Sequence, residues 1–252
     1  MSVVQHKSVE STSQNPTITL DSPVTAGHML LAVVAASFLN AVIGLGDNGD
    51  SSPYVGNQYD LIVQDGGNPD YIYLYAATVT QAGSLTLEVN FESNDGNPKH
   101  IHLFEVAGYD TFDKLGGATQ SNTSNPSCSI TNNTTKADEF VFAYFLGTTH
   151  PGDTFTAGSG YTAGELTNAS GFSLFTEYKE ITSVGQPSAS ANITSGPDSV
   201  VSAVFTFYSS SDSGGGNGGS GNSGTPTGDD APRYHGRQRH TKPPARTFRR
   251  AA

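Results

Sequence analysis

Short runs of alternating apolar and polar residues, each closed by a turn signal, constrain the fold of this chain most. In the clearest run, residues 84–91, apolar side chains occupy every second position from Leu85 to Phe91. A period of two places those side chains on one face of a β-strand. A turn signal rich in Asn, Gly and Pro follows at 94–98.

Comparable runs recur through the first 208 residues and predict ten to twelve strands, with no convincing helix. A loop is expected through Gly116-Gly117, and the segment 150–168 is expected to be loop-rich. Because hairpin-type turns separate most runs, we predict an all-β, two-sheet antiparallel β-sandwich that is jelly-roll-like, with an Ig-like sandwich as the alternative. The expected strands are Thr17–Leu20, His28–Phe38, Gln58–Val63, Tyr71–Val79, Ser84–Phe91, His100–Val106, Ser127–Thr131, Phe140–Leu146, Phe172–Ile181, Ser188–Thr194 and Ser199–Tyr208.

The longest apolar run extends from Met29 to Leu45 and is interrupted by Ser37, Asn40 and Gly44. A membrane-spanning helix needs about 20 apolar residues. We therefore predict two buried strands joined by a turn near residues 39–40, and no membrane span.

The charges of the chain are sorted along its length. Residues 1–208 contain twenty acidic residues and five lysines, a net charge of −15, whereas residues 233–252 carry +7 and no acid. We predict a β-sandwich domain over 1–208, a flexible Gly/Ser/Asn-rich linker over 209–232 and a basic Arg-rich tail over 233–252. The tail is expected to anchor the protein electrostatically to an anionic partner, the alternatives being a disordered solubility tail and docking on the acidic body. The cations of the tail are Arg233, Arg237, Arg239, Lys242, Arg246, Arg249 and Arg250.

Composition restricts the partners and the compartment. The acidic body disfavours nucleic acid as its ligand, because phosphate would be repelled. The single cysteine, Cys128, excludes an internal disulfide and is expected to be a small apolar residue in or beside a strand. The first residues lack the apolar core of a signal peptide, so we expect synthesis in the cytoplasm.

The sequence contains no signature of a catalytic site. A Walker loop, an HExxH motif, a dinucleotide fingerprint and a nucleophile elbow are all missing. Glu105 with Asp110, or Glu177 with Glu180, could be imagined as the acid pair of a glycoside hydrolase, but twenty acids supply such pairs by chance. We predict a non-enzymatic protein, with a glycan-active hydrolase as a remote alternative.

Aromatic residues give the first candidate ligand site. Tyr71, Tyr73 and Tyr75 alternate along one strand and project from one sheet face. They form either a stacking platform for a glycan or, as we favour, a partly buried tyrosine ladder. Tyr54 and Tyr161 in loops are further candidates for glycan stacking.

Two polar groupings could hold a metal. Asp47 and Asp50 lie in an oxygen-rich loop and are the favoured candidates for a structural Ca²⁺, although Asx-Gly sequences are primarily turn signals. His100 and His102 share a strand face, but no third ligand is evident. We predict a solvated histidine pair at a sheet edge, and we expect no cofactor.

The order of motifs over residues 15–208 resembles a group of β-sandwich modules, of poorly defined function, found in bacterial surface proteins and phage virion proteins. The resemblance implies a jelly-roll or Ig-like fold and transfers no catalytic residue. Its segments are 26–33 (AGHMLLAV), 47–50 (DNGD), 72–76 (IYLYA), 82–87 (AGSLTL), 104–110 (FEVAGYD), 137–141 (ADEFV), 160–162 (GYT) and 176–179 (TEYK).

Together these observations favour a phage structural protein on the virion surface, as a capsid decoration or fibre-like component. The sandwich would be displayed for adhesion, possible ligands being cell-surface glycans, and the basic tail would anchor it to other virion or surface proteins. The alternative is a carbohydrate-binding module of a bacterial surface or secreted protein. A homo-oligomer is compatible with either hypothesis.

Overall fold

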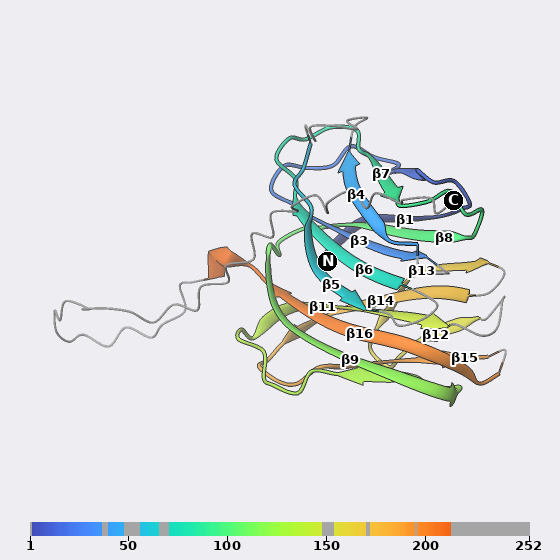
Figure 1. Cartoon of the computed structure of the whole chain (residues 1–252). Coiled ribbons are helices and arrows are strands. Elements are labelled where there is room, and N and C mark those ends of the chain that lie inside the picture. The colour runs from blue at the N-terminus through green and yellow to red at the C-terminus, as the bar shows by residue number, and fades with distance from the viewer. Residues whose placement is uncertain are drawn as a thin grey trace, which may run out of the picture. The chain divides into compact units, whose positions relative to one another are not determined.

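The computed structural model describes residues 2–36, 40–47, 56–65, 71–147, 154–169, 172–194 and 196–212. These residues form sixteen β-strands and one short 3-10 turn, η1 (Ser210–Asp212), and they contain no α-helix. All strand pairs among them are antiparallel. The predicted all-β, antiparallel class is confirmed (Figure 1).

The strands divide into a first half, β1 to β8, and a second half, β9 to β16. The first half comprises β1 (Val3–Ser11), β2 (Thr17–Thr19), β3 (Met29–Ala36), β4 (Val42–Asp47), β5 (Asp60–Asp65), β6 (Tyr71–Thr78), β7 (Thr86–Phe91) and β8 (Lys99–Val106). The second half comprises β9 (Thr111–Thr123), β10 (Ser127–Ser129), β11 (Asp138–Gly147), β12 (Phe155–Ala157), β13 (Thr162–Ala169), β14 (Phe172–Thr182), β15 (Ser188–Ile193) and β16 (Asp198–Tyr208).

The two halves have the same topology. The first half has a large sheet of order β1-β8-β3-β6-β5 and a small sheet of order β2-β7-β4. In the second half the orders are β9-β16-β11-β14-β13 and β10-β15-β12, which are the same orders with each strand number raised by eight. Each half is therefore a jelly-roll-like sandwich, and the chain contains that sandwich twice.

Backbone hydrogen bonds recur between the halves. Leu20 N donates to Leu85 O (3.1 Å), and Ile130 N donates to Pro187 O (3.0 Å). The other recurring pairs are Val24 N to Gly83 O with Thr134 N to Gly185 O, Val89 N to Pro16 O with Ala191 N to Pro126 O, and Phe91 N to Gln14 O with Ile193 N to Ser124 O. In every pair the segment after the first strand is offset by 110 residues and the segment after the sixth strand by 102, so the correspondence is residue by residue.

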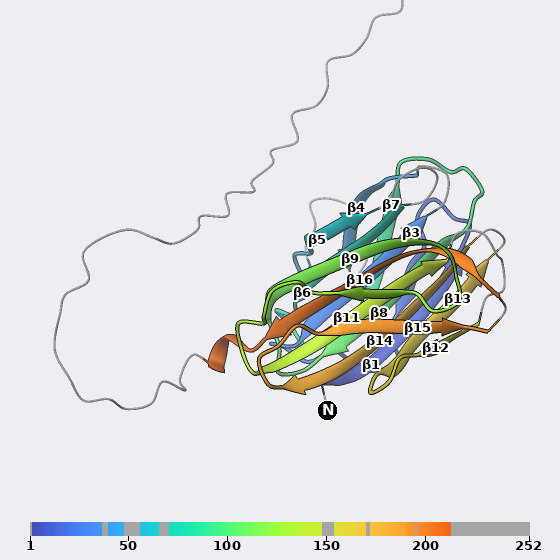
Figure 2. The same ribbon diagram turned by 90° about the horizontal axis from the view of Figure 1, so that it is seen from below.

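The sheets stack in four layers, with the large sheets in the middle and a small sheet outside each (Figure 1; Figure 2 gives the view from below). One apolar core fills the space between the two large sheets, and it takes side chains such as Leu31 and Val33 from the first half and Phe142 and Phe205 from the second. Two further cores lie between each large sheet and its own small sheet.

This layering differs from the two-sheet sandwich expected over residues 1–208. Four sheets are present because the sandwich is duplicated, and residues 1–214 nevertheless form one compact unit. The predicted pair of strands within Met29–Leu45 is present as β3 and β4, and β3 is buried as expected. The expectation that the second strand is also buried is wrong, because β4 belongs to the outer small sheet and its Ile43 is 65% exposed. The predicted linker and tail lie outside the described residues from 213 onward.

We expect the central core to carry much of the stability. Phe142→Ala removes a ring that is 0% exposed between the large sheets, and cavity formation there should lower the free energy of unfolding by about 3–5 kcal/mol. Phe112→Ala is the control, because that ring is 37% exposed. Denaturant titration of both variants checks this, and an equal loss would contradict the assigned core.

Candidate functional site

The interface between the large sheets has two edges. At one edge β1 packs against β13, and we call it the closed edge. At the other, a cavity separates β5 from β9, and we call it the open edge. Since the repeat equates β1 with β9 and β13 with β5, each edge is the structural counterpart of the other. Differences between them are therefore not demanded by the fold.

A carboxylate seals the closed edge. Ser8 Oγ donates a hydrogen bond of 2.6 Å to Oε2 of Glu165 on β13. The other carboxylate oxygen, Glu165 Oε1, lies 2.6 Å from His6 Nδ1. Both partners come from β1, and the His6 ring stacks on Phe104 with a centroid distance of 5.2 Å. Hydrogen bonds from His6 and Ser8, against the opposing effect of burial, hold the pKa of Glu165 below its usual value. The two halves are thus fastened by a polar clamp.

Two buried histidines of β8, His100 and His102, also contact β13. Thr167 Oγ1 on β13 is 2.5 Å from His100 Nδ1 and 2.8 Å from His102 Nε2. His102 Nδ1 is also 3.3 Å from the Thr176 hydroxyl on β14. The His100 ring meets the Phe172 ring edge-on at 4.2 Å. Both imidazoles therefore cross from the first large sheet to groups of the second.

The expectation of a solvated histidine pair at a sheet edge is wrong. His100 and His102 are both 0% exposed, because β8 is an interior strand of a sheet that is covered on both faces. Burial lowers the pKa of His100 to about 4. Burial, reinforced by His100 and His6, lowers the pKa of His102 well below its usual value. The pair is therefore neutral at physiological pH.

The second half shows that the fold does not require these imidazoles. The register of β8 with β3 and of β16 with β11 equates His100 with Val201 and His102 with Ala203. Thr176 likewise corresponds to Leu74. Apolar side chains thus occupy the matching positions of the sister sandwich, so the closed edge is a specialisation of one edge of the interface.

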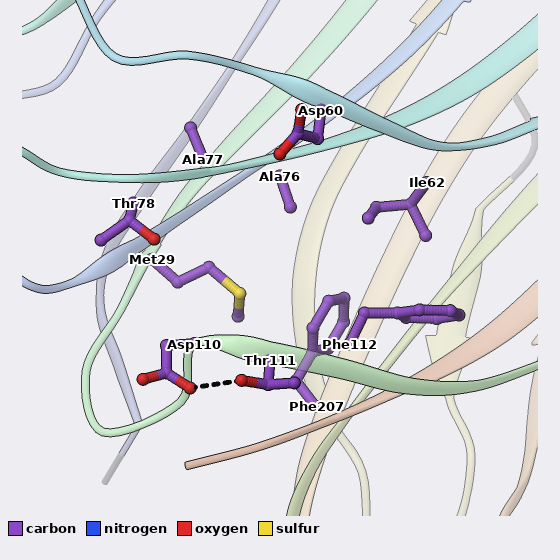
Figure 3. Close-up of a pocket in the computed structure, with 10 residues that line it drawn as sticks. All are labelled: Met29, Asp60, Ile62, Ala76, Ala77, Thr78, Asp110, Thr111, Phe112 and Phe207. Atoms are coloured by element: carbon purple, nitrogen blue, oxygen red, sulfur yellow. Dashed lines mark hydrogen bonds between the residues drawn. The ribbon is translucent and has the colours of Figure 1, made fainter. Parts of the chain in front are cut away.

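The open edge contains a cavity of about 240 Å³. Figure 3 shows two carboxylates on opposite walls, Asp60 from β5 and Asp110 from the connection between β8 and β9. Met29, Phe112 and Phe207 supply apolar surface between them. The other lining residues are Ile62, Ala76, Ala77, Thr78 and Thr111.

Asp110 also fastens the end of the described chain. Its Oδ1 accepts Ser210 N and Thr111 Oγ1, both at 2.8 Å, and its Oδ2 accepts Ser210 Oγ at 2.6 Å. Burial opposes the effect, but these hydrogen bonds lower the pKa of Asp110. The last described residues are therefore held beside the cavity by the Asp110 carboxylate.

The predicted tyrosine row lies inside the first half. Neighbouring rings of Tyr71, Tyr73 and Tyr75 have centroid distances of 6.1 Å, and the row packs into the core beneath the small sheet. Tyr73 is 2% exposed, and burial raises the pKa of Tyr73 and of Tyr75. Tyr73 therefore offers little ring surface to a glycan, whereas Tyr71 and Tyr75 are half-buried, and glycan stacking on them stays a prediction.

Tyr161 and Asp47 are likewise engaged in internal contacts. The Tyr161 hydroxyl donates to Ser188 O at 2.7 Å, and Lys179 Nζ lies 4.2 Å from the centre of the ring. Asp47 is 1% exposed and accepts hydrogen bonds from Asn57 N (3.1 Å) and Asn57 Nδ2 (2.8 Å). The Tyr59 hydroxyl donates to Asp47 as well, at 3.2 Å.

The remaining sequence candidates fall outside the described residues. They are Tyr54, Asp50 and the seven cations of the tail: Arg233, Arg237, Arg239, Lys242, Arg246, Arg249 and Arg250. Among the described residues, no group of three or more His, Cys, Asp or Glu side chains is placed to hold a metal ion. Calcium binding at Asp47 and Asp50 stays a prediction.

The imagined acid pairs have different surroundings. Glu105 is 0% exposed and accepts Gln5 Nε2 at 2.7 Å and Thr25 N at 2.8 Å, and its Oε1 lies 2.7 Å from His28 Nδ1. Glu177 is buried in the second half, where burial raises its pKa to about 7, whereas Glu180 is exposed. Positions three apart on a strand project from opposite faces, so Glu177 and Glu180 do not face one cleft.

Cys128 lies in β10 and is 4% exposed, as predicted for a small apolar residue. Burial raises the pKa of its thiol to about 12, so the thiolate is disfavoured at neutral pH. His6, Glu165, Asp60 and Phe112 were not among the site residues predicted from the sequence. No local motif marks them, because strands distant in sequence bring them to the two edges.

Comparison of the chain with protein-family models, curated proteins and solved structures gave no match. No helix with the length and apolarity of a membrane span occurs in the described part of the chain.

The buried histidines predict acid sensitivity. An unfolded histidine has a pKa of about 6.5, so between pH 6.5 and about 4 the unfolded chain binds a proton that folded His100 does not. Stability is therefore fully present above pH 6.5 and is lost as the pH falls towards 4, by up to about 1.4 kcal/mol per pH unit for each such group.

Replacing His100 with glutamine should flatten this dependence. Denaturant titrations of wild type and His100→Gln at half-unit steps from pH 7.5 to 4 measure the slopes. We expect a shallower slope for the variant in the window below pH 6.5. Identical slopes, with both proteins folded at pH 7.5 by circular dichroism, would contradict the assigned role.

Proposed function

We propose that this chain is a non-enzymatic structural protein of a phage virion surface, in which the double sandwich is displayed for adhesion or decoration and the basic tail anchors it. The single observation that carries the proposal is the sorting of charge on either side of a fixed exit point. Residues 1–208 have a net charge of −15 and residues 233–252 have +7. The body ends where Asp110 fastens Ser210.

Rigidity of the body supports a display role. The two sandwiches share one core, and the clamp of His6 and Ser8 on Glu165 joins them at the edge. The fold needs no disulfide, since Cys128 is the one cysteine in the sequence. A body of this kind suits synthesis in the reducing cytoplasm followed by release on lysis.

The hydrogen bonds that buried carboxylates make inside the body support a binding role over a catalytic role. Glu105, Asp47 and Glu165 each accept hydrogen bonds from at least two neighbouring residues. A catalytic acid or base needs access to the proton of a substrate. The carbohydrate-binding alternative draws no support from Tyr73, because the core of the first half covers that ring.

Replacing the arginines of the tail tests the anchoring role. In one full-length variant all six arginines become glutamine, and in the matched control they become lysine, which preserves charge. We expect the lysine form to be retained on purified virions and the glutamine form to be lost, because the attraction is electrostatic.

Quantitative mass spectrometry of virions, washed at low and at high salt, measures retention. A wild-type chain missing from the particles would contradict the virion assignment. Full retention of the glutamine form would instead contradict anchoring by the tail.

A further inference from the structure

We propose that the cavity at the open edge binds a small alkylammonium ion, that is, a protonated amine on a short apolar chain. The ammonium group lies at the rim beside Asp60, and the apolar chain extends inward between Phe112 and Met29. Only described residues of the body form this site, and the site does not depend on the virion assignment.

The cavity is built by the inner faces of the two large sheets. The first sheet contributes Asp60 on β5, and it contributes Thr78 on β6 directly opposite Met29 on β3. The second sheet contributes Phe112 on β9 opposite Phe207 on β16, and the centroids of these two rings are 5.8 Å apart. The register of the strands therefore fixes which side chains meet at the cavity.

Asp60 supplies a carboxylate that can receive a cation. Asp60 is exposed at the cavity, and no hydrogen bond or ion pair joins its side chain to another described residue. The second carboxylate, Asp110, already accepts hydrogen bonds from Thr111 and Ser210, so it contributes negative charge and is not needed as an acceptor. An ammonium group donates a strong, charge-assisted hydrogen bond to a carboxylate such as that of Asp60.

The apolar lining favours an organic cation over an inorganic one. Phe112 presents a ring that is 37% exposed, and an aromatic face attracts an ammonium group within about 6 Å of its centroid. Met29 and Phe207 are almost fully buried and form the inner apolar wall (Figure 3). A short methylene chain is stabilised when this surface removes it from water, whereas a hydrated metal ion gains nothing from such contact.

The volume and the charge of the body narrow the ligand further. The cavity measures about 240 Å³, which is below the range of about 300–1,000 Å³ that is usual for sites of drug-sized molecules. A sugar chain needs more room, whereas an amine with a few carbon atoms fits. Residues 1–208 have a net charge of −15, which attracts cations and repels anions of the same size.

The closed edge shows that the fold does not require these two groups. The strand registers equate Asp60 with Thr162 and Phe112 with Val3. The closed edge therefore has neither a carboxylate nor an aromatic ring at the matching positions, and the clamp on Glu165 joins the two sheets there instead. The combination of a carboxylate and a ring is thus a specialisation of the open edge.

Methionine provides a selective probe, because the chain has two methionines and Met29 lines the cavity. Full-length protein labelled with ¹³C in the methionine methyl groups is titrated with butylammonium, and the Met29 signal is assigned with Met29→Leu. Butanol and butanoate, which have the same chain length, are the matched ligands. We expect a saturable shift with butylammonium, binding of butanol that is weaker by about three- to tenfold, and no saturable shift with butanoate.

Variants separate the two recognition elements. Asp60→Asn should weaken butylammonium binding by about two- to fivefold and leave butanol binding unchanged, whereas Phe112→Ala should weaken the binding of both. The matched control, Asp138→Asn with Ile43→Ala, changes an exposed carboxylate and an exposed apolar side chain elsewhere and should bind as the wild type does. Circular dichroism of each variant distinguishes loss of the site from loss of the fold.

Three results would overturn the proposal. They are a Met29 signal that butylammonium does not shift saturably, equal affinities for butylammonium and butanol, and an unchanged affinity for butylammonium in folded Asp60→Asn protein. None of these results measures retention on virions, so this proposal and the proposed function can fail separately.

Discussion

Face-to-face packing of the two large sheets is the interaction on which the rest of this structure depends. Each large sheet is covered on one side by its own small sheet and on the other by the sister large sheet. Strands β3 and β8 are consequently buried along their whole length. That double coverage explains why polar residues on β8, such as His100 and Glu105, must find partners inside the protein.

Because the sandwich is duplicated, equivalent positions in the two halves can be compared directly. Positions that are histidine on β8 are apolar on β16, so the polar closed edge reflects specialisation and not a requirement of the topology. The open edge differs, since a cavity separates its strands and Asp110 at that cavity binds Ser210. Polar contacts thus hold the two halves together at the closed edge, whereas the open edge contains a cavity.

The sequence predicted the strands whose apolar residues follow the expected period. Thr86–Phe91 and Asp138–Gly147 match predicted runs closely. The sequence did not predict β9, because Gly116-Gly117 resembles a turn signal. In the structure Gly116 lies inside the strand, and a Cβ atom there would be only 2.0 Å from Ser129 O. The glycine is therefore needed for the close approach of two strands. Strands β1 and β13 were missed because their polar residues face the closed edge, where only the tertiary structure provides partners.

The repeat also escaped detection. Its surviving traces are short, such as Asn-Pro at 15–16 and 125–126 and the glycines Gly83 and Gly185. Between these markers the core positions changed in size, for instance Leu87 to Ala189. Sheets tolerate such changes when the facing layer compensates in volume. The buried histidines could not be foreseen, because a histidine pair beside a turn is equally compatible with a sheet edge.

We expect the two sandwiches to unfold as one cooperative body, because they share one core. Native-state hydrogen exchange of the full chain at increasing denaturant tests it most directly, with amides of β3 and β11 as reporters of the two halves. Both sets of amides should exchange with the same opening free energy and the same denaturant dependence, since neither large sheet can lose its partner and remain covered. Exchange of one half through a separate, lower-energy opening while the other stays protected would contradict it.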